Sequence, residues 1–280
     1  MTQLNLTQPS PVSWGTRYIT ASRYTLIEQA HNRMAIILLV VFVPIWYFII
    51  GDITPPDPVA FKLWSSGDFL QVNGHNLVVL SSGLNALTMV IGFILFTSTR
   101  RSTSFDRRLI LSGYPQPVLI LAKLTSVVLV AGLVSLYATI ILYLFWQPTH
   151  PLIIWLGFFS EGLIYGGLGL LLGVLLKGEL EGFFLVMMIS LMDTLLQNPV
   201  GNPAANKEFL KFFPSYSSMQ LTVSGEFNDT ILWQYLMFSL VWFAGFALLG
   251  LVIFYWKTRS PIHIGPEKSS NSTGNQKTQG

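Results

Sequence analysis

Two acidic residues lie inside long apolar runs of this sequence, Glu161 in FFSEGLIYGGLG and Asp193 in MISLMDTLLQN. An ionisable side chain inside a bilayer is costly, so such residues usually face the interior of a helix bundle or a water-filled cavity. Asn85 adds an amide group to another apolar run. Two interpretations are open. Either the three residues line a path for a substrate or a cation, or the carboxyl groups are structural, being hydrogen-bonded between helices or close enough to the membrane interface to stay hydrated.

Residue types that carry catalysis or bind metals are absent or scattered. The chain has no cysteine, which excludes disulfides and thiolate metal ligands. Its four histidines fall in separate connections, without the spacing of metal ligands, at His31, His75, His150 and His263. An intramembrane protease is disfavoured, because the sequence has no H-E-x-x-H motif and no serine–histidine pair at membrane depth. We therefore expect neither a metal site nor enzymatic activity in this chain.

The composition is that of a membrane protein. Of the 280 residues, 51% are hydrophobic and 10% are charged, and the mean hydropathy is +0.55. Soluble domains carry about 25% charged residues. The net charge of +3 is small, so we expect no nucleic-acid partner. Residues 1–33 are too polar for a cleavable signal peptide, and we expect the first apolar run to remain in the protein.

Six apolar runs are long enough to cross a bilayer, which takes about 20 residues. They lie at about 34–51, 77–97, 118–146, 152–176, 182–198 and 231–256. The fifth is short and carries Asp193, so its outer boundary is the least defined. The fourth contains glycines in G-x-x-x-G spacing, at 162 and 166 and at 169 and 173, which favours close helix packing within the subunit or across a dimer. The predicted fold class is an all-α integral membrane protein with six transmembrane helices.

Basic residues predict the orientation of these helices. If both termini are cytoplasmic, only three of the 16 lysines and arginines fall in outer connections, at Lys62, Lys207 and Lys211. The other 13 lie on the inner side, which is the expected bias for cytoplasmic loops. We expect the two ends of the chain, 1–15 and 257–280, to be disordered, because they are too polar to bury much surface.

A basic stretch between the second and third runs, TSTRRSTSFDRRLILSGYPQP, has the signals of a short helix. Ser104 is a suitable N-cap and Asp106 falls in the first turn, where a carboxylate favours the helix dipole. Gly113 can end the helix, and the prolines that follow it forbid its continuation. The pattern predicts a separate two-turn helix at about 104–112. The plain alternative is a topology-setting basic loop that happens to be helical.

The layout resembles the permease subunit of an ATP-binding-cassette exporter with six spans. Four segments carry the resemblance, and they are TRYITASRYTLIEQAHNR before the first span, SFDRRLILSGYPQPVLILAKL, the turn LLKGELEGFF, and QNPVGNPAANKEFLKFFPSYSSMQ before the last span. In the family, these correspond to an amphipathic connecting helix, here 16–33, a coupling helix, a tight turn between spans four and five, and short outer-leaflet helices, here about 199–225. The transmembrane domain would cover 34–256.

The resemblance implies roles for particular residues. The coupling helix would dock on a separate ATPase subunit through Phe105, Asp106, Arg107, Arg108 and Leu109. The connecting helix would contribute Arg17, Arg23 and Glu28. Phe209, Phe212 and Phe213 would form an outer gate, for which the alternative is a simple interfacial anchor.

The resemblance also implies partner subunits that supply what this chain lacks. The sequence has no G-x-x-x-x-G-K-[ST] phosphate loop, since GVLLKGEL lacks the second glycine before its lysine. ATP and magnesium would therefore bind the partner ATPase, and a second permease subunit, identical or related, would complete the transporter within membrane lipid. The expected location is a bacterial plasma membrane, and the expected cargo is hydrophobic or amphipathic. The alternative is a non-ATPase integral membrane carrier or assembly factor.

Overall fold

The computed structural model describes residues 13–228 and 231–259. The predicted disordered ends lie mostly outside this part of the chain. Where they overlap it, at 14–15 and 257–259, the chain is helical, which corrects those boundaries. The elements are α1 (Trp14–Ala30), α2 (Arg33–Ile37), η1 (Leu38–Phe42), α3 (Val43–Ile53), β1 (Pro58–Lys62), β2 (Phe69–Asn73), α4 (Gly74–Leu111), α5 (Gln116–Leu142), α6 (Pro151–Leu175), α7 (Glu179–Gln197), η2 (Glu208–Phe212), α8 (Ser215–Phe227) and α9 (Trp233–Arg259).

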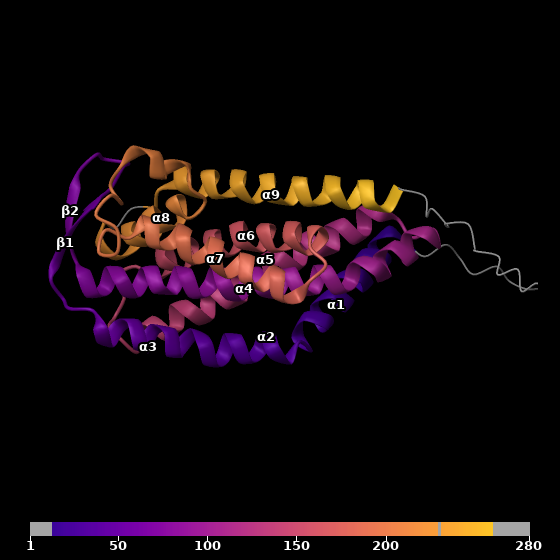
Figure 1. Ribbon diagram of the computed structural model, residues 1–280, viewed down its shortest axis with the longest axis horizontal. Helices are drawn as coiled ribbons and strands as arrows, with labels where there is room; N and C mark the ends of the chain where they lie inside the picture. Colours follow the sequence, from indigo (N-terminus) through magenta and orange to yellow (C-terminus); the bar gives the residue numbers. More distant parts are fainter. Residues whose placement is uncertain (1–12, 229–230, 260–280) are drawn as a thin grey trace, which may run out of the picture.

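The long helices run side by side along one axis (Figure 1). The antiparallel hairpin of β1 and β2, together with α8, lies at one end of the bundle, which we call the hairpin end. The α1 end is the opposite one, where α1 lies and where α9 finishes (Figure 1). The hairpin was not anticipated from the sequence.

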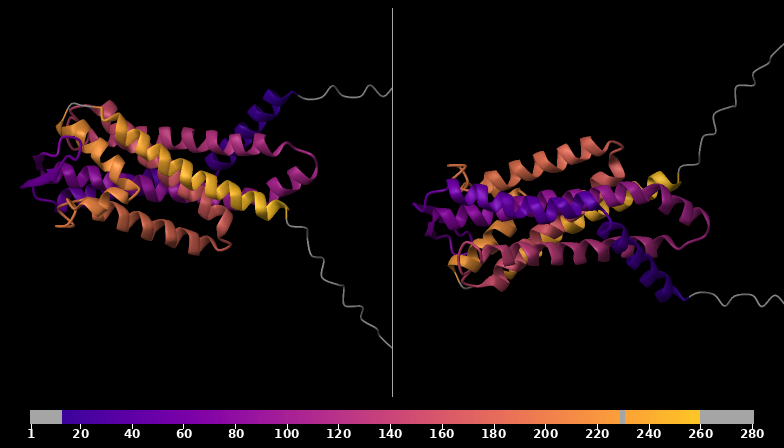
Figure 2. Two further views of the ribbon diagram at one scale, coloured as in Figure 1. Left: turned by 90° about the horizontal axis from the view of Figure 1, so that it is seen from above. Right: turned by 90° about the horizontal axis from the view of Figure 1, so that it is seen from below.

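Five helices of the described chain are long and apolar enough to cross a membrane. They are Arg33–Ile53, which joins α2, η1 and α3, then α4, α5, α6 and the α9 segment Trp233–Lys257. The fold is thus all-α with the character of an integral membrane protein. The fifth predicted span, 182–198, corresponds to α7, which has 19 residues, carries Glu179, Glu181 and Asp193, and does not belong to this set. It runs back along the flank of the bundle towards the hairpin end (Figure 2).

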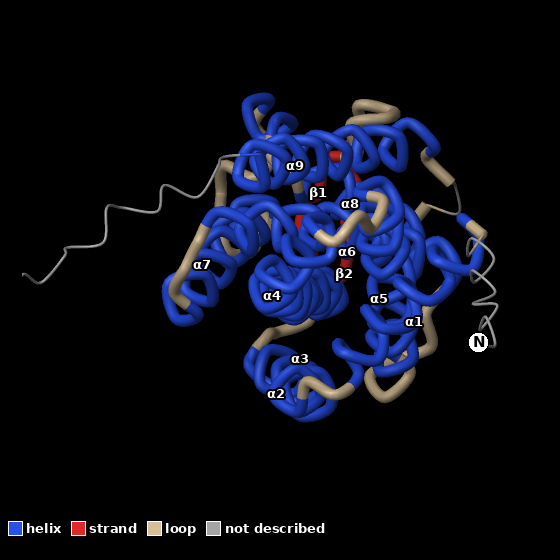
Figure 3. Tube along the Cα trace, turned by 90° about the vertical axis from the view of Figure 1, so that its right-hand side faces the viewer, coloured by secondary structure: helices blue, strands red, loops and turns tan. Residues whose placement is uncertain are grey.

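Helices α4 and α6 form the centre of the bundle, with the other long helices around them (Figure 3). In their most apolar 18-residue stretches, 94% of α4 and 89% of α6 is buried, against 17% for α9. The glycines of α6 explain this close approach. A Cβ at Gly169 would lie 2.5 Å from the Gly92 carbonyl oxygen of α4, and one at Gly166 would lie 2.6 Å from Val127 of α5. These glycines therefore pack within the chain.

Helix α4 corrects the prediction of a separate helix at 104–112. It is continuous for 38 residues, so Ser104 lies inside it and does not cap anything. Its end matches the sequence signals, because Gly113 has a φ of 90° and its amide bonds to the Ile110 carbonyl at 3.0 Å. The Tyr114 amide bonds to the Leu109 carbonyl at 2.9 Å, which completes a glycine-terminated C-cap.

Helix α8 is polar in composition, and yet Ser215 to Glu226 are all buried. Its backbone lies against α6, where a Cβ at Gly157 would come within 2.9 Å of the Thr222 amide nitrogen. The end of β1 and the loop after it also contact α8. Gln220 accepts a hydrogen bond from the Trp64 amide at 3.2 Å and donates one to the Lys62 carbonyl at 3.1 Å. The polar helix thus sits inside the hairpin end of the bundle.

Candidate functional site

Glu161 and Asp193 come together although they belong to different helices. Both contact Ser215, the first residue of α8. The Ser215 hydroxyl lies 2.5 Å from Glu161 Oε1 and 2.9 Å from Asp193 Oδ2. Tyr165 donates to Asp193 Oδ2 at 2.8 Å. We call these four residues the carboxylate cluster.

Asp193 also has a structural role at the start of α8. Its Oδ2 accepts the Ser215 backbone N–H at 3.0 Å. The first amides of a helix lack intrahelical partners, and a carboxylate is favoured there by the helix dipole. Glu161 has no such role, and it is fully buried. The two carboxyl groups therefore occupy one site but differ in the donors around them.

Asn85, the third residue expected on a path, lies in a different network. Its side-chain amide donates to Thr194 at 2.8 Å and to Ser190 at 3.2 Å, which joins α4 to α7. Ser190 also contacts Thr88 through its hydroxyl. A cavity of about 180 Å³ lies beside this network, between α3, α4 and α7, and Asn85 lines it. The structure brings two of the three residues together and leaves Asn85 in a helix–helix seam.

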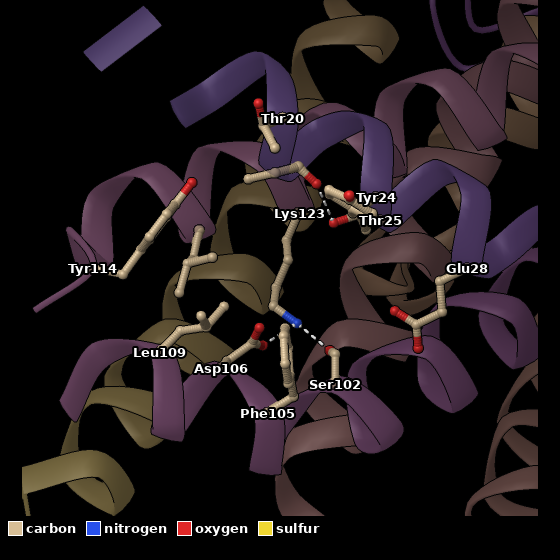
Figure 4. A pocket seen from close by; sticks show the side chains of 12 residues that line it. Thr20, Tyr24, Thr25, Glu28, Ser102, Phe105, Asp106, Leu109, Tyr114 and Lys123 are labelled. Atoms are coloured by element: carbon tan, nitrogen blue, oxygen red, sulfur yellow. Dashed lines mark hydrogen bonds and ion pairs between the residues drawn. The ribbon is translucent and has the colours of Figure 1, made fainter. Parts of the chain in front are cut away.

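A pocket of about 410 Å³ lies at the α1 end, between α1, the end of α4 and the start of α5 (Figure 4). Lys123 of α5 reaches into it. Its Nζ lies 2.7 Å from Asp106 Oδ2 and donates to the Ser102 hydroxyl at 2.5 Å. The Asp106 side chain is only 7% exposed and that of Lys123 14%, so the ion pair is largely removed from water. We call this site the α1 pocket.

Helix α1 closes one side of the α1 pocket. The Tyr114 hydroxyl donates to the Arg17 carbonyl at 2.8 Å, which fastens α1 to the α4–α5 turn. Glu28 faces the pocket from α1, and desolvation by its surroundings raises the pKa of its carboxyl group, while the Lys123 charge opposes that rise. The side chains of Arg23 and Glu28 are exposed in terms of solvent-accessible area, whereas Arg17 is half-buried.

The five residues predicted to dock on an ATPase differ in their exposure. Phe105 is 61% exposed and Arg108 is exposed, so both are available on the surface of α4. Asp106 points inwards to Lys123, and Leu109 lines the pocket. Arg107 is half-buried. Sequence reasoning missed Lys123 as the partner of Asp106.

A second ionic contact at the α1 end joins α4 to the turn between α6 and α7. Arg100 pairs with Glu179 and also donates to the Lys177 carbonyl at 2.6 Å. Arg101 lies 3.4 Å from the same carboxylate. The hydrogen bond from Arg100 lowers the pKa of Glu179, and both arginine charges act in the same direction. The Glu179 side chain is 46% exposed, so this is a surface network.

The three phenylalanines expected at an outer gate lie at the hairpin end. Phe209 and Phe212 are 52% and 77% exposed, while Phe213 is half-buried. The rings of Phe209 and Phe213 meet edge to face with centroids 6.4 Å apart. The three phenylalanines precede α8 in the sequence, and this helix begins directly after Pro214.

No group of three or more metal-ligating side chains occurs within residues 13–228 and 231–259. No protein-family model and no curated protein matches this chain at significant similarity. The function is therefore argued from the two sites themselves. The α1 pocket can transmit contacts made at the end of the bundle, and the carboxylate cluster can hold a proton or a charge within it.

Proposed function

We propose that this chain is the permease subunit of an ATP-binding-cassette exporter, with ATP hydrolysed by a separate ATPase subunit. The observation that carries the proposal is the length and continuity of α4. A helix of 38 residues is about 57 Å long, whereas the hydrocarbon core is about 30 Å thick. The last turns of α4 therefore extend beyond the bilayer at the α1 end.

The extension of α4 is suited to transmit a movement of a bound partner to the helix bundle. It continues, without a break, the helix that lies at the centre of the bundle. Its exposed Phe105 and Arg108 offer an aromatic and a positive charge to a partner surface. The buried pair of Asp106 and Lys123 ties the extension to α5. A contact at this end would thus move several helices together.

In this proposal the α1 end is cytoplasmic, and α7 also crosses the membrane, as the fifth of six spans. Basic residues favour that side, because Arg17, Arg23, Arg100, Arg101 and Arg108 all belong to elements of the α1 end. The cargo is hydrophobic or amphipathic and leaves at the hairpin end, past Phe209 and Phe212. A second permease subunit completes the transporter. A bacterial plasma membrane is the proposed location.

The experiment is co-purification of the full chain from its native membranes in mild detergent, followed by identification of its partners. We expect a phosphate-loop ATPase to co-purify with the wild-type chain and to be lost from a Phe105→Ala, Arg108→Ala variant. The matched control is Phe209→Ala, Lys211→Ala, which removes the same two residue classes at the hairpin end and should retain the ATPase.

A non-ATPase carrier is the second candidate, and the carboxylate cluster is the observation that favours it, because ionisable groups at membrane depth often mark ion paths. If no ATPase co-purifies even after mild cross-linking, or if both double variants retain it equally, the exporter proposal is wrong. The carrier or assembly-factor alternative would then lead.

A further inference from the structure

The carboxylate cluster contains more hydrogen-bond acceptors than its protons can serve. An ionised carboxylate only accepts hydrogen bonds, and a serine hydroxyl has a single proton. The Ser215 hydroxyl nevertheless lies at hydrogen-bonding distance from both carboxyl groups, 2.5 Å from Glu161 and 2.9 Å from Asp193. If both groups were ionised, one of these two contacts would lack a hydrogen. One proton on the pair of carboxyl groups satisfies both.

Two further atoms indicate a missing proton. Glu161 Oε2 and Asp193 Oδ1 are buried and have no hydrogen-bond partner, and the two residues are 0% and 3% exposed. A buried charge without a partner costs several kcal/mol, and neutralisation removes most of that cost. The site thus favours a net charge of −1, with one proton bound to the pair of carboxyl groups.

No basic side chain of the neighbouring helices compensates the pair. The sequence has no lysine, arginine or histidine in α4 from 76 to 99, in α5 from 124 to 142, in α6, α7 or α8, or in α9 from 233 to 256. The other titratable groups on these segments are tyrosines, Glu226, and Glu179 and Glu181 in the first turn of α7, where Glu179 pairs with Arg100. Tyr165 belongs to the cluster, and the ring of Tyr216 meets that of Tyr235 edge to face. Tyr137 donates to the Val40 carbonyl, and Glu226 accepts from the Thr149 amide.

The donors decide which carboxyl group carries the proton. Asp193 Oδ2 receives the Ser215 backbone N–H at the start of α8 and the Tyr165 hydroxyl, and both stabilise an anion. Glu161 contacts the Ser215 hydroxyl, and Ser218 is its other hydroxyl neighbour. The proton therefore belongs on Glu161, which donates to Ser215, and Ser215 in turn donates to Asp193.

We propose that Glu161, Ser215 and Asp193 form a proton-binding site in which Glu161 holds one proton at neutral pH, and that this proton fastens the start of α8 to α6. Loss of the proton leaves two carboxylates facing one serine hydroxyl, whose single hydrogen can bond to only one of them. The repulsion between the two charges then separates α8 from α6. Because Ser215 is the first residue of α8, the protonation state of the site affects the position of this polar helix at the hairpin end. The inference does not depend on the exporter proposal.

Infrared spectroscopy of the full chain in lipid nanodiscs tests the site directly. A protonated carboxyl group has a C=O stretching band that is separate from the carboxylate bands. The spectrum of the wild type minus that of Glu161→Gln should show this band at neutral pH. The matched control is Glu208→Gln, which removes an 82% exposed carboxylate and should remove no such band. Asp193→Asn should retain it.

If Glu161→Gln removes no acid band, or if Asp193→Asn removes it, the assignment of the proton is wrong. If the acid band is absent and a carboxylate band instead shifts when sodium replaces a bulky organic cation, the site binds a metal cation and the proposal also fails. Should Glu161→Gln not fold, Ser215→Ala keeps both carboxyl groups. There the acid band should persist and shift, and an unshifted band would overturn the Glu161–Ser215 contact.

A cross-linking measurement tests the fastening of α8. The chain has no cysteine, and the hydroxyl groups of Ser160 on α6 and Ser218 on α8 lie 2.9 Å apart. Ser160→Cys with Ser218→Cys should form a disulfide when α8 lies against α6. At one mildly alkaline pH, we expect cross-linking several-fold faster with Glu161→Gln, which stays neutral, than with Glu161. Equal rates would mean that the proton does not hold α8.

Discussion

The carboxylate cluster and the α1 pocket each bury acidic side chains, but they neutralise them differently. In the α1 pocket, Asp106 meets Lys123 at 2.7 Å near the end of the bundle. In the cluster, Glu161 and Asp193 meet a serine and a tyrosine in the apolar interior. Bringing a lysine to that depth would add a second desolvation penalty, which an ion pair recovers only with excellent geometry. The comparison indicates that depth decides whether a carboxyl group gains a cation or a proton.

The largest effect should come from breaking the ion pair of the α1 pocket. Lys123→Met keeps the length of the side chain but leaves Asp106 buried without its cation. Removing one partner of a buried ion pair costs about 3–5 kcal/mol. We expect a loss of this size in the free energy of unfolding, measured by denaturation of the purified chain with SDS in mixed micelles.

The companion variant distinguishes charge from packing. Asp106→Asn combined with Lys123→Met removes both charges, so it should be clearly more stable than Lys123→Met alone. If the single and double variants are equally unstable, the lysine stem packs the pocket and the ion pair is not what matters there. The contrast with the cluster would then lose its basis.

A smaller effect is expected in the cluster, and it should be unequal for its two acids. Asp193→Asn weakens the charge-assisted bonds from the Ser215 amide and the Tyr165 hydroxyl, and bonds to charged groups contribute about 1.5–3 kcal/mol. Glu161→Gln should cost less than about 1 kcal/mol, because its amide N–H donates to Ser215 as a protonated carboxyl group does. The same denaturation assay measures both. A larger loss for Glu161→Gln than for Asp193→Asn would contradict a protonated Glu161.

Sequence alone identified both regions but not the partners within them. Glu161 and Asp193 were evident because a carboxyl group in an apolar run is exceptional. Ser215 had no such signal, since serine is ordinary at the start of a helix. Lys123 has a sequence signal in its position relative to the turn. Asp106 lies seven residues before Gly113 and Lys123 ten residues after it, so the two can meet where the end of α4 and the start of α5 lie side by side.

The boundaries of α4 show a different limit of sequence reasoning. Ser104 is a good N-cap residue, and the helix nevertheless passes through it without interruption. Capping preferences contribute about 1 kcal/mol, which is less than the continuous hydrogen bonding and packing of a long helix. The termination at Gly113 could be predicted, because glycine readily adopts the positive φ that the chain needs there.

Glu28 offers a pH-dependent test at the rim of the α1 pocket. Desolvation raises the pKa of its carboxyl group above the ordinary value, so the ionised form destabilises the fold. The stability linked to this group is fully present below its ordinary pKa and is lost as the pH rises through the raised one. Glu28→Gln should therefore have a higher Tm than the wild type at neutral pH, with the difference vanishing as the pH falls. A difference that grows on acidification would contradict a desolvated Glu28.

The smallest effect is expected at Glu179, whose exposed network with Arg100 and Arg101 contrasts with both buried regions. The hydrogen bond from Arg100 lowers the pKa of Glu179, so its stabilisation is present above the ordinary pKa and is lost as the pH falls through the lowered one. Exposed ion pairs contribute about 0.2–1 kcal/mol and are screened by salt. Glu179→Gln should lower the free energy of unfolding by no more than that at neutral pH, and added salt should remove the difference. A loss comparable to that of Lys123→Met, insensitive to salt, would mean that this turn is as desolvated as the α1 pocket, and exposure would no longer separate the two.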